Sequence, residues 1–293
     1  ARILTGTVTD KTENRSMNEI EKSTLYVVGT PIGNLADISE RAKKVLSEVD
    51  FVCAEDTRVS GKLLGLYGIK KTLVSYHEHN KTAAAKGIIE RLLSGESGAI
   101  VTDAGMPAVS DPGQELVKSC RENGIKVSPI PGACAFVSAL ASSGFPSRAF
   151  CFEGFLPQDK KEKKTVLERC KNESRTVIFY EAPHRLLKTL EEFYAAFGER
   201  DICLARELTK LNEEFSDMKL SDAVSYYKEN QPRGEYVIIL GGAEQTEKAD
   251  FENLTVNQHV EFYISQGYSK MDAIKACAAD RNVPKSVIYK EFI

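Results

Sequence analysis

Short apolar runs alternate with amphipathic segments through most of the chain, and this alternation limits the folds that it can adopt. The stretch over residues 99–113 shows the unit at its clearest. Residues 99–101 are apolar, which is typical of a buried strand, and turn-forming residues follow from Asp103 onward. Ser110-Asp111-Pro112 joins a capping residue to a proline and predicts a helix start, with helical spacing up to Cys120. We therefore expect a strand, a polar loop and a helix here.

The same unit recurs along the first half of the chain and predicts a mainly parallel sheet with helices on both faces. The expected strands cover residues 25–28, 51–54, 72–76, 99–101 and 126–130. A polar cluster follows each strand, at residues 29–34, 55–58, 77–80, 103–111 and 131–135. Because parallel strands end at one edge of a sheet, we expect these clusters to meet there, where open α/β sheets bind their ligands.

A second α/β pattern follows the Gly- and Pro-containing segment 143–147, which we interpret as a hinge. Its expected strands are residues 150–152, 176–180, 202–205 and 236–240, and its expected helices are 160–171, 183–197 and 220–229. Short Ala-rich helices end the chain and resemble a helix-turn-helix, with a small interaction or capping bundle as an equal alternative. We therefore predict a flexible N-terminal extension (1–24), an α/β cofactor domain (25–143), a second α/β domain (148–243) and a helical domain (254–293).

Charge, hydropathy and cysteine usage exclude several classes of protein. The 293 residues carry a formal net charge of -3, so no overall basic field indicates nucleic-acid binding, which would need a local basic surface. No apolar run approaches the ~18 residues of a transmembrane helix, and we expect no membrane partner. The 7 cysteines are scattered without a C-x-x-C pair, so we expect free thiols in a reducing cytoplasm and no metal site.

Three loops resemble the cofactor loops of the tetrapyrrole-methylase-like (class III) S-adenosylmethionine methyltransferases. They are Val28-Gly29-Thr30-Pro31-Ile32-Gly33, the loop 103–113 with its Asp103-Ala104-Gly105-Met106-Pro107 start, and Pro129-Ile130-Pro131-Gly132-Ala133.

Six motifs in a fixed order resemble one branch of that class, the ribosomal small-subunit methyltransferase I family. They are Val-Gly-Thr-Pro-Ile-Gly-Asn-Leu at 28–35, Ala-Glu-Asp-Thr-Arg at 54–58, His-Glu-His-Asn at 77–80, Glu-Gly-Phe-Leu-Pro at 153–157, Glu-Ala-Pro-His-Arg at 181–185 and Ala-Arg-Glu-Leu-Thr-Lys at 205–210. Each motif alone is weakly specific, but six in the same order indicate the family from about residue 25 to the end.

The resemblance implies two α/β domains with S-adenosylmethionine folded in the cleft between them, and a homodimer. It also implies methylation of a ribose 2′-hydroxyl, on a decoding-site cytidine of 16S rRNA in the small ribosomal subunit. The first loop spaces its glycines as G-x-x-x-G and no G-x-G-x-x-G pattern occurs, so a nicotinamide cofactor is disfavoured.

The resemblance assigns a set of residues to the cofactor. Asp103 is the strongest candidate, because its carboxylate would accept hydrogen bonds from the amino group or the ribose hydroxyls of the cofactor. The alternative for Asp103 is a cap on a neighbouring helix. The glycines would allow close backbone approach, or would simply form turns. The full set is Gly29, Pro31, Ile32, Gly33, Asp103, Met106, Ala133, Cys134, Pro183 and Glu235.

The acceptor hydroxyl needs in-line placement at roughly 3–3.5 Å from the methyl group, and a nearby base or cation would help it to react. The sequence offers several candidates for this base or cation without selecting one: Glu55, Asp56, Arg58, His77, Glu207 and Lys210. The expected RNA contacts are Arg58, His77, Asn80, Arg185, Arg206 and Lys210, with salt bridges as the alternative for the arginines. His77 and His79 share one side of an extended segment, but without a third ligand we expect hydrogen bonding and no zinc.

Two other functions remain open at this stage. A small-molecule tetrapyrrole or corrin-precursor methylase would share the three cofactor loops, although not the six motifs or the helical tail. A non-catalytic RNA-binding protein of ribosome assembly would have no use for the polar strand ends.

Overall fold

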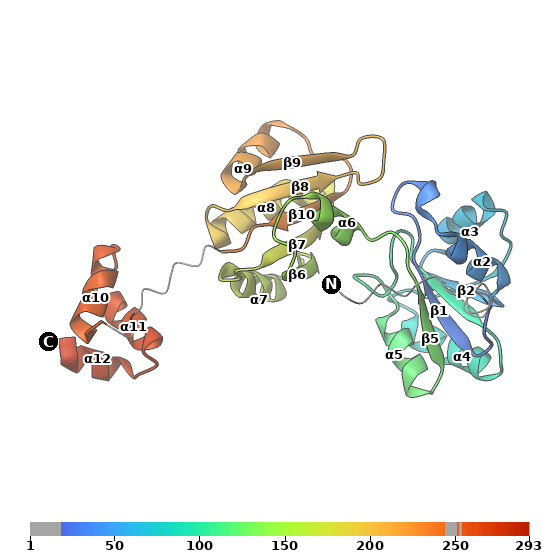
Figure 1. The fold of residues 1–293 in the computed structure, drawn as a ribbon, viewed down its shortest axis with the longest axis horizontal. Coiled ribbons are helices and arrows are strands. Elements are labelled where there is room, and N and C mark those ends of the chain that lie inside the picture. Colours follow the sequence, from blue (N-terminus) through green and yellow to red (C-terminus); the bar gives the residue numbers. More distant parts are fainter. Residues whose placement is uncertain (1–18, 244–250, 252–253, 293) are drawn as a thin grey trace, which may run out of the picture. The chain divides into compact units, whose positions relative to one another are not determined.

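The computed structural model describes residues 19–243, 251 and 254–292 (Figure 1). Contacts divide the chain into two units, Ala1–Gly242 and Ala243–Ile293. Of the predicted extension 1–24, residues 1–18 lie outside the described residues. Within the described ranges, no helix combines the length and the apolar character that crossing a bilayer requires.

A parallel five-stranded sheet forms the first part of the larger unit. Its strands are β1 (Thr24–Val28), β2 (Phe51–Ala54), β3 (Thr72–Ser75), β4 (Gly98–Val101) and β5 (Lys126–Ile130), in the order β3-β2-β4-β1-β5. The five strands and their parallel pairing confirm the prediction. Because β4 is the middle strand, the stretch 99–113 leaves the sheet at its centre.

Alternate residues of the strands pack against helices on opposite faces of this sheet. Tyr26 and Val28 pack with α2 (Glu40–Glu48) and α3 (Thr57–Leu66), which follow the short 3-10 helix η1 (Leu35–Asp37). Leu25 and Val27 pack with α4 (Lys81–Leu93) and α5 (Gln114–Glu122). Both faces are thus buried, which explains why these strands read as continuous apolar runs.

Helix α5 begins at Gln114, so the helix start predicted at Ser110-Asp111-Pro112 is wrong. Ser110 has a φ of 60° and Gly113 a φ of 139°, and such left-handed backbone cannot belong to a right-handed helix. No side chain caps the first turn of α5. The capping residues instead belong to a loop, which leaves the Asp111 carboxylate available for another role.

A mixed five-stranded sheet forms the second part of the unit. Its strands are β6 (Phe150–Phe155), β7 (Thr176–Glu181), β8 (Asp201–Arg206), β9 (Glu214–Lys219) and β10 (Tyr236–Leu240), in the order β6-β7-β10-β8-β9. β6 and β7 are parallel, and the other neighbouring pairs are antiparallel. The four predicted strands are confirmed. β9 was not predicted, because this edge strand mixes charged and apolar residues and forms no apolar run.

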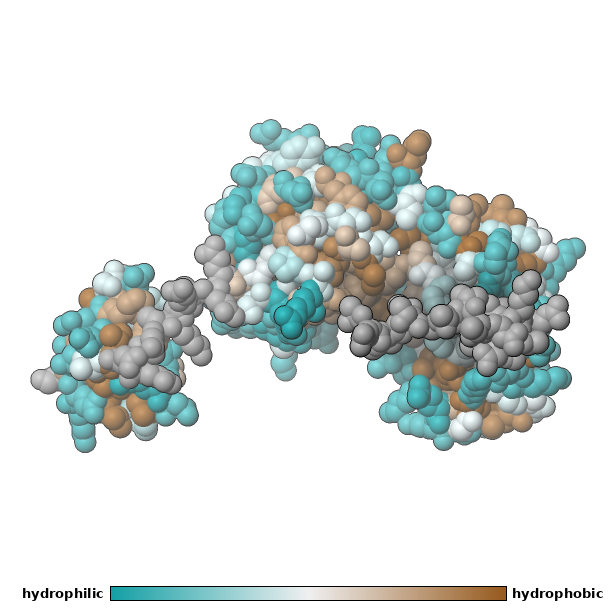
Figure 2. All heavy atoms as spheres, viewed as in Figure 1, coloured by the Kyte–Doolittle hydropathy of each residue, from teal (hydrophilic) through white to brown (hydrophobic). Residues whose placement is uncertain are grey.

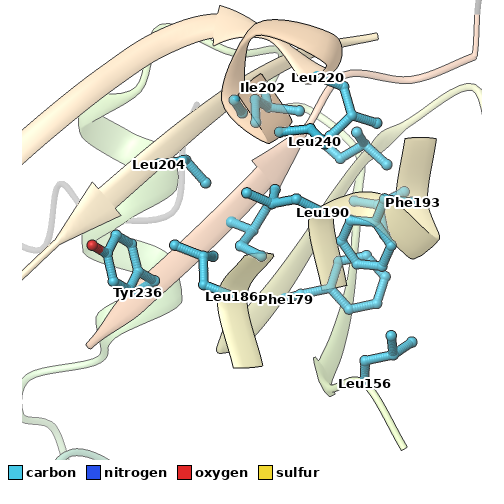
Figure 3. Close-up of a cluster of buried hydrophobic side chains, with 14 of the residues drawn as sticks. Leu156, Phe179, Leu186, Leu190, Phe193, Ile202, Leu204, Leu220, Tyr236 and Leu240 are labelled. Atoms are coloured by element: carbon cyan, nitrogen blue, oxygen red, sulfur yellow. The ribbon is translucent and has the colours of Figure 1, made fainter. Parts of the chain in front are cut away.

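Three helices cover one face of the second sheet, with the bounds that the sequence predicts: α7 (Lys160–Lys171), α8 (Pro183–Phe197) and α9 (Leu220–Glu229). Figure 3 shows the core between sheet and helices, where Phe179 of β7 lies against Leu190 and Phe193 of α8. The ring centroids of Phe179 and Phe193 are 4.7 Å apart.

Helix α6 (Ala135–Ser142) covers the other face of the second sheet, although it precedes the expected hinge. Its Ala139 and Leu140 pack with Ile178 and Val237 of that sheet. Figure 2 shows hydrophobic residues gathered around the place that α6 takes in Figure 1. The loop that joins β5 to α6 therefore runs from the first sheet to the second.

The C-terminal unit is a bundle of three helices, α10 (Val256–Ser265), α11 (Lys270–Asp280) and α12 (Lys285–Phe292). Its core consists of Val260, Ala273, Ile274, Cys277, Ala278 and Ile288. Thr255 and Gln258 form a capping box at the start of α10. The predicted helical tail is confirmed. The three helices fit both interpretations of the tail, a helix-turn-helix and a capping bundle.

Candidate active site

A cavity of about 400 Å³ lies between the carboxyl edge of the first sheet and the second sheet. One wall includes Ile32, Glu55 and Cys134, which follow β1, β2 and β5, and the loop after β4. The other lining residues include Tyr180 of β7, in the second sheet, and Leu208, in the loop after β8. Small-molecule sites commonly have roughly 300–1,000 Å³, so the cleft can enclose a cofactor-sized ligand.

Hydrogen bonds hold the first and second predicted cofactor loops together. The Thr30 amide donates to the Gly105 carbonyl at 2.9 Å, and the Gly105 amide donates back to the Thr30 carbonyl at 3.2 Å. The Thr30 hydroxyl also donates to the Thr102 carbonyl at 3.2 Å. The predicted meeting of strand-end loops at one sheet edge is therefore confirmed for these loops.

The cavity brings together part of the predicted cofactor set. Ile32, Asp103, Met106, Cys134 and Glu235 line it. The remaining members lie outside the lining: Gly29, Pro31, Gly33, Ala133 and Pro183. All of these except Gly29 are chain neighbours of a lining residue.

Gly33 has a reason for being glycine that does not involve a ligand. A Cβ at this position would lie 2.5 Å from Cγ of Lys210 and 2.8 Å from the hydroxyl oxygen of Thr209, both in the loop after β8. The neighbouring Asn34 amide donates to that Thr209 hydroxyl at 3.0 Å. The first cofactor loop is thus fastened to the second α/β domain.

Three carboxylates, Glu55, Asp103 and Asp111, line the same side of the cavity. Burial is the largest cause that raises the pKa of each of them, and it raises the pKa of Asp111 to about 6. Repulsion between carboxylates adds to the effect for Glu55 and Asp111, whereas the nearby Thr102 hydroxyl, which donates to Glu55, opposes it. The cavity therefore contains a negative wall that favours a cationic ligand.

The position of Asp103 is compatible with both interpretations, a cofactor contact and a cap on a neighbouring helix. It lines the cavity, and it also accepts a hydrogen bond from the backbone amide of Asp56, the N-cap of α3. That hydrogen bond lowers the pKa of Asp103 and works against burial. One carboxylate oxygen facing α3 leaves acceptor capacity for a ligand.

Residues of the Glu-Ala-Pro-His-Arg motif contact one another and the neighbouring chain. Glu181, which is buried and lines the cavity, accepts from the Ala182 amide at 2.9 Å and from the Thr189 hydroxyl. Arg185 lies 3.3 Å from the Glu181 carboxylate and also donates to the Leu156 carbonyl. These contacts support a structural role for Arg185 at the start of α8.

The predicted RNA contacts all lie outside the cavity lining: Arg58, His77, Asn80, Arg185, Arg206 and Lys210. Among the cations, Arg206 pairs with Glu214 at 2.7 Å, and Lys210 bridges Glu207 at 2.9 Å and Glu235 at 2.8 Å.

Arg58 and Asn80 differ in how free their side chains are. Arg58 pairs with Asp56 at 2.7 Å but keeps 86% of its side chain exposed, more than the other predicted cations. Asn80 holds its own loop, accepting from the His77 amide at 2.8 Å and donating to the Ser75 carbonyl at 3.1 Å. Arg58 is therefore the cation best placed to reach an external phosphate.

The predicted bases differ in their electrostatic surroundings. Arg58 holds the pKa of Asp56 well below its usual range, and Lys210 lowers the pKa of Glu207, so both carboxylates are weak bases engaged by cations. Glu55 lines the cavity with a raised pKa. The Nδ1 atom of His77 is buried and has no hydrogen-bond partner among the described residues.

Several cavity residues were missed from the sequence, namely Thr102, Asp111, Phe155, Tyr180 and Glu181. Asp111 lies in the Ser-Asp-Pro-Gly segment, whose pattern predicts a helix start and no ligand contact. Within the described part of the chain, no group of three or more His, Cys, Asp and Glu side chains has a metal-binding arrangement.

Comparison with solved structures defines the class of this fold. Diphthine synthase superposes on 75% of the chain and 90% of its own length, with a TM-score of 0.60 and 15% identity. Cobalt precorrin-4 methyltransferase covers 75% of the chain and 95% of its own length, with a TM-score of 0.55 and 18% identity. The family model of the tetrapyrrole (corrin/porphyrin) methylases matches residues 24–224. The fold and the cleft thus define a tetrapyrrole-methylase-type protein.

Closer relatives specify the branch of that class. A ribosomal RNA small subunit methyltransferase I from Halalkalibacterium halodurans is 48% identical, over 95% of this chain and 98% of its own. The one from Bacillus subtilis is 47% identical, over 92% and 93%. The chain therefore belongs to the ribosomal RNA small subunit methyltransferase I family, as its six motifs predicted.

Proposed function

We propose that this protein is an S-adenosylmethionine-dependent methyltransferase that methylates a ribose 2′-hydroxyl of small-subunit rRNA. The target is a decoding-site cytidine, cytidine 1402 of 16S rRNA. The observation that carries the proposal is the cavity in which hydrogen-bonded strand-end loops face the second sheet, in a chain of this family.

The residues of the cavity fit the proposed cofactor. Apolar side chains such as Ile32, Met106 and Leu208 provide surfaces for an adenine ring, and Asp103 provides an acceptor for amino or hydroxyl groups. The carboxylate wall offsets the positive charge of a sulfonium. When bound, S-adenosylmethionine supplies an electrophilic methyl group on that sulfonium. The chain then has to orient the acceptor hydroxyl in line with it and to exclude water.

The RNA would be recognised outside the cavity by a few cations. Arg58, with its exposed guanidinium beside the sheet edge, is proposed as a phosphate contact, together with His77, Asn80, Arg206 and Lys210. Arg185, the sixth predicted contact, is instead assigned a structural role, because it pairs with Glu181 and donates to the Leu156 carbonyl. A net charge of -3 agrees with recognition of a local RNA shape and of a few unstacked nucleotides. We further propose that the protein acts in the cytoplasm as a homodimer, on 16S rRNA within the small ribosomal subunit.

One experiment tests this function. The protein is incubated with labelled S-adenosylmethionine and small subunits from a strain that lacks the family enzyme, and the modified nucleotide is mapped. Label on the ribose of the expected cytidine supports the proposal. Label only on an added porphyrinoid would indicate a tetrapyrrole methylase, and no label at all would indicate a non-catalytic RNA-binding protein.

A further inference from the structure

Asp111 occupies a strained loop that the second α/β domain supports. Ala108 and Ser110 have positive φ values of 67° and 60°, which are uncommon outside glycine and cluster at functional sites. A Cβ on Gly154 of β6 would lie 2.7 Å from the Ser110 hydroxyl oxygen, so the loop packs tightly on that strand. The fold thus places Asp111 in the cavity wall instead of at the start of a helix.

Titratable groups surround Asp111 on two sides. Glu55 and Asp103 raise its pKa from the first sheet edge, and the Thr102 hydroxyl there, which donates to Glu55, lowers it. On the second sheet, the charges of Asp111 and of Cys134 at the start of α6 both raise the pKa of Tyr180 in β7. Burial raises the pKa of Tyr180 to about 12 and also raises the pKa of Cys134, so both stay protonated at neutral pH. Among the described residues, the groups that act on Asp111 thus include no cation.

We propose that Asp111 is the general base that removes the proton from the acceptor hydroxyl during methyl transfer. This inference rests on the proposed function. As the acceptor oxygen bonds to the methyl carbon, the carbon–sulfur bond breaks and its electron pair stays on sulfur. The hydroxyl proton passes to the Asp111 carboxylate and then to solvent, and S-adenosylhomocysteine leaves with a neutral thioether.

The other carboxylates are less suited to this role. Asp56 and Glu207 are engaged by Arg58 and Lys210, and one acceptor site of Asp103 is taken by the amide at the start of α3. Glu55 accepts a hydrogen bond from the Thr102 hydroxyl at 3.4 Å, and its charge contributes to the raised pKa of Asp111. A base with a pKa of about 6 is close to the ideal for work near neutral pH.

The test compares single-turnover methylation of small subunits by the wild type and by Asp111→Asn across pH 5–9. We expect the wild-type rate to fall as the pH drops through about 6, because Asp111 then becomes protonated. Asp111→Asn is expected to be slower by roughly 10²–10⁴-fold and to lose this ionisation from its pH profile. Its affinity for S-adenosylhomocysteine, measured by calorimetry, is expected to stay at the wild-type level.

Two further variants complete the design. Asp111→Glu keeps the carboxylate and should recover part of the rate together with an ionisation in the profile. Asp159→Asn is the matched control, because Asp159 caps α7 and asparagine caps helices equally well. Its rate and pH profile should equal those of the wild type.

Each result decides between the two claims. A wild type that does not label rRNA overturns the proposed function. Labelling by wild type and Asp111→Asn at equal rates overturns only the assignment of Asp111 as the general base. A slow Asp111→Asn variant with an unchanged pH profile also overturns that assignment. Loss of S-adenosylhomocysteine affinity in that variant would assign Asp111 to cofactor binding and would equally reject the inference.

Discussion

The backbones of Gly29 and Gly132 are in direct contact. A Cβ added to Gly29 would lie 2.7 Å from Cα of Gly132, and one added to Gly132 would lie 2.8 Å from Cα of Gly29. Because these are backbone atoms, no rotamer change relieves such a clash. The glycines therefore join the first cofactor loop to the third, and Gly29 adds a hydrogen bond from its amide to the Ile130 carbonyl at 3.1 Å.

Replacing Gly132 by alanine is expected to separate these loops. Overpacking of this kind costs about 1–3 kcal/mol, and the displaced wall should also weaken S-adenosylmethionine binding. Urea unfolding and calorimetry measure the two effects. Gly87→Ala is the control, because Gly87 lies inside α4 with open space around its Cβ position, and it should be stabilising by about 0.5–1 kcal/mol. Equal stability of the two variants would contradict this account.

Asp103→Ala is expected to lose most of the affinity for S-adenosylmethionine. A hydrogen bond to a charged group contributes about 1.5–3 kcal/mol, so the dissociation constant should rise by roughly 10–100-fold. Calorimetry on the folded variant provides the value. Wild-type affinity would show that Asp103 serves α3 alone, through its hydrogen bond with the Asp56 amide.

How far the sequence could predict this structure depended on the kind of signal. Buried strands such as β1 and β10 were predictable because both of their faces are apolar, and α8 was predictable from its helical spacing. β9 was not predictable from hydrophobic runs, because an exposed edge strand needs no apolar run. The meeting of the strand-end loops at one edge of the first sheet was also predictable, because all parallel strands end at the same edge.

The details of the site were less accessible. Ser110-Asp111-Pro112 suits a helix start and a left-handed loop alike, and the loop depends on tertiary packing such as that of Ser110 on Gly154. In the same way, the exposure of Arg58 and the internal contacts of Arg185 depend on neighbours distant in the chain. Residue type and spacing carry no information about such contacts.

Arg58 and Arg185 should respond differently to the same substitution. Arg58→Gln is expected to weaken binding of the small subunit and to lower the salt dependence of binding by about one unit of slope, without changing the melting temperature. Arg185→Gln is expected to lower the melting temperature, because the buried Glu181 loses its cationic partner and the Leu156 carbonyl loses the guanidinium donor. Filter binding at several salt concentrations and thermal unfolding separate the two, and identical behaviour would contradict the assignment.

The C-terminal unit has its own core, and its removal should affect only part of the function. A chain truncated after Gly242 is expected to bind S-adenosylmethionine normally, because every residue that lines the cavity precedes that point. Methylation of assembled subunits should fall if the three helices contact RNA or protein there. Full activity of the truncated chain on subunits would refute such a contact.

His259 gives the C-terminal unit a pH-dependent stability. Its ring is fully buried and stacks on Phe251 with centroids 3.7 Å apart. Nδ1 accepts from Nε of Arg281 at 3.1 Å, so the ring proton resides on Nε2, which donates to Asp280 at 3.1 Å. Burial lowers the pKa of His259, with a smaller contribution from Arg281, while Asp280 opposes the shift.

The direction of the effect follows from proton linkage. Below pH about 6.5 the unfolded chain binds a proton at His259 that the folded chain does not, so the C-terminal unit should lose stability as the pH falls from there toward the lowered pKa. Hydrogen exchange of α10–α12 amides in the full chain, converted to opening free energies at pH 7.5 and 5.5, measures this loss. His259→Gln should reduce the difference between the two pH values, because glutamine does not titrate. The same pH dependence in that variant would place the responsible group elsewhere.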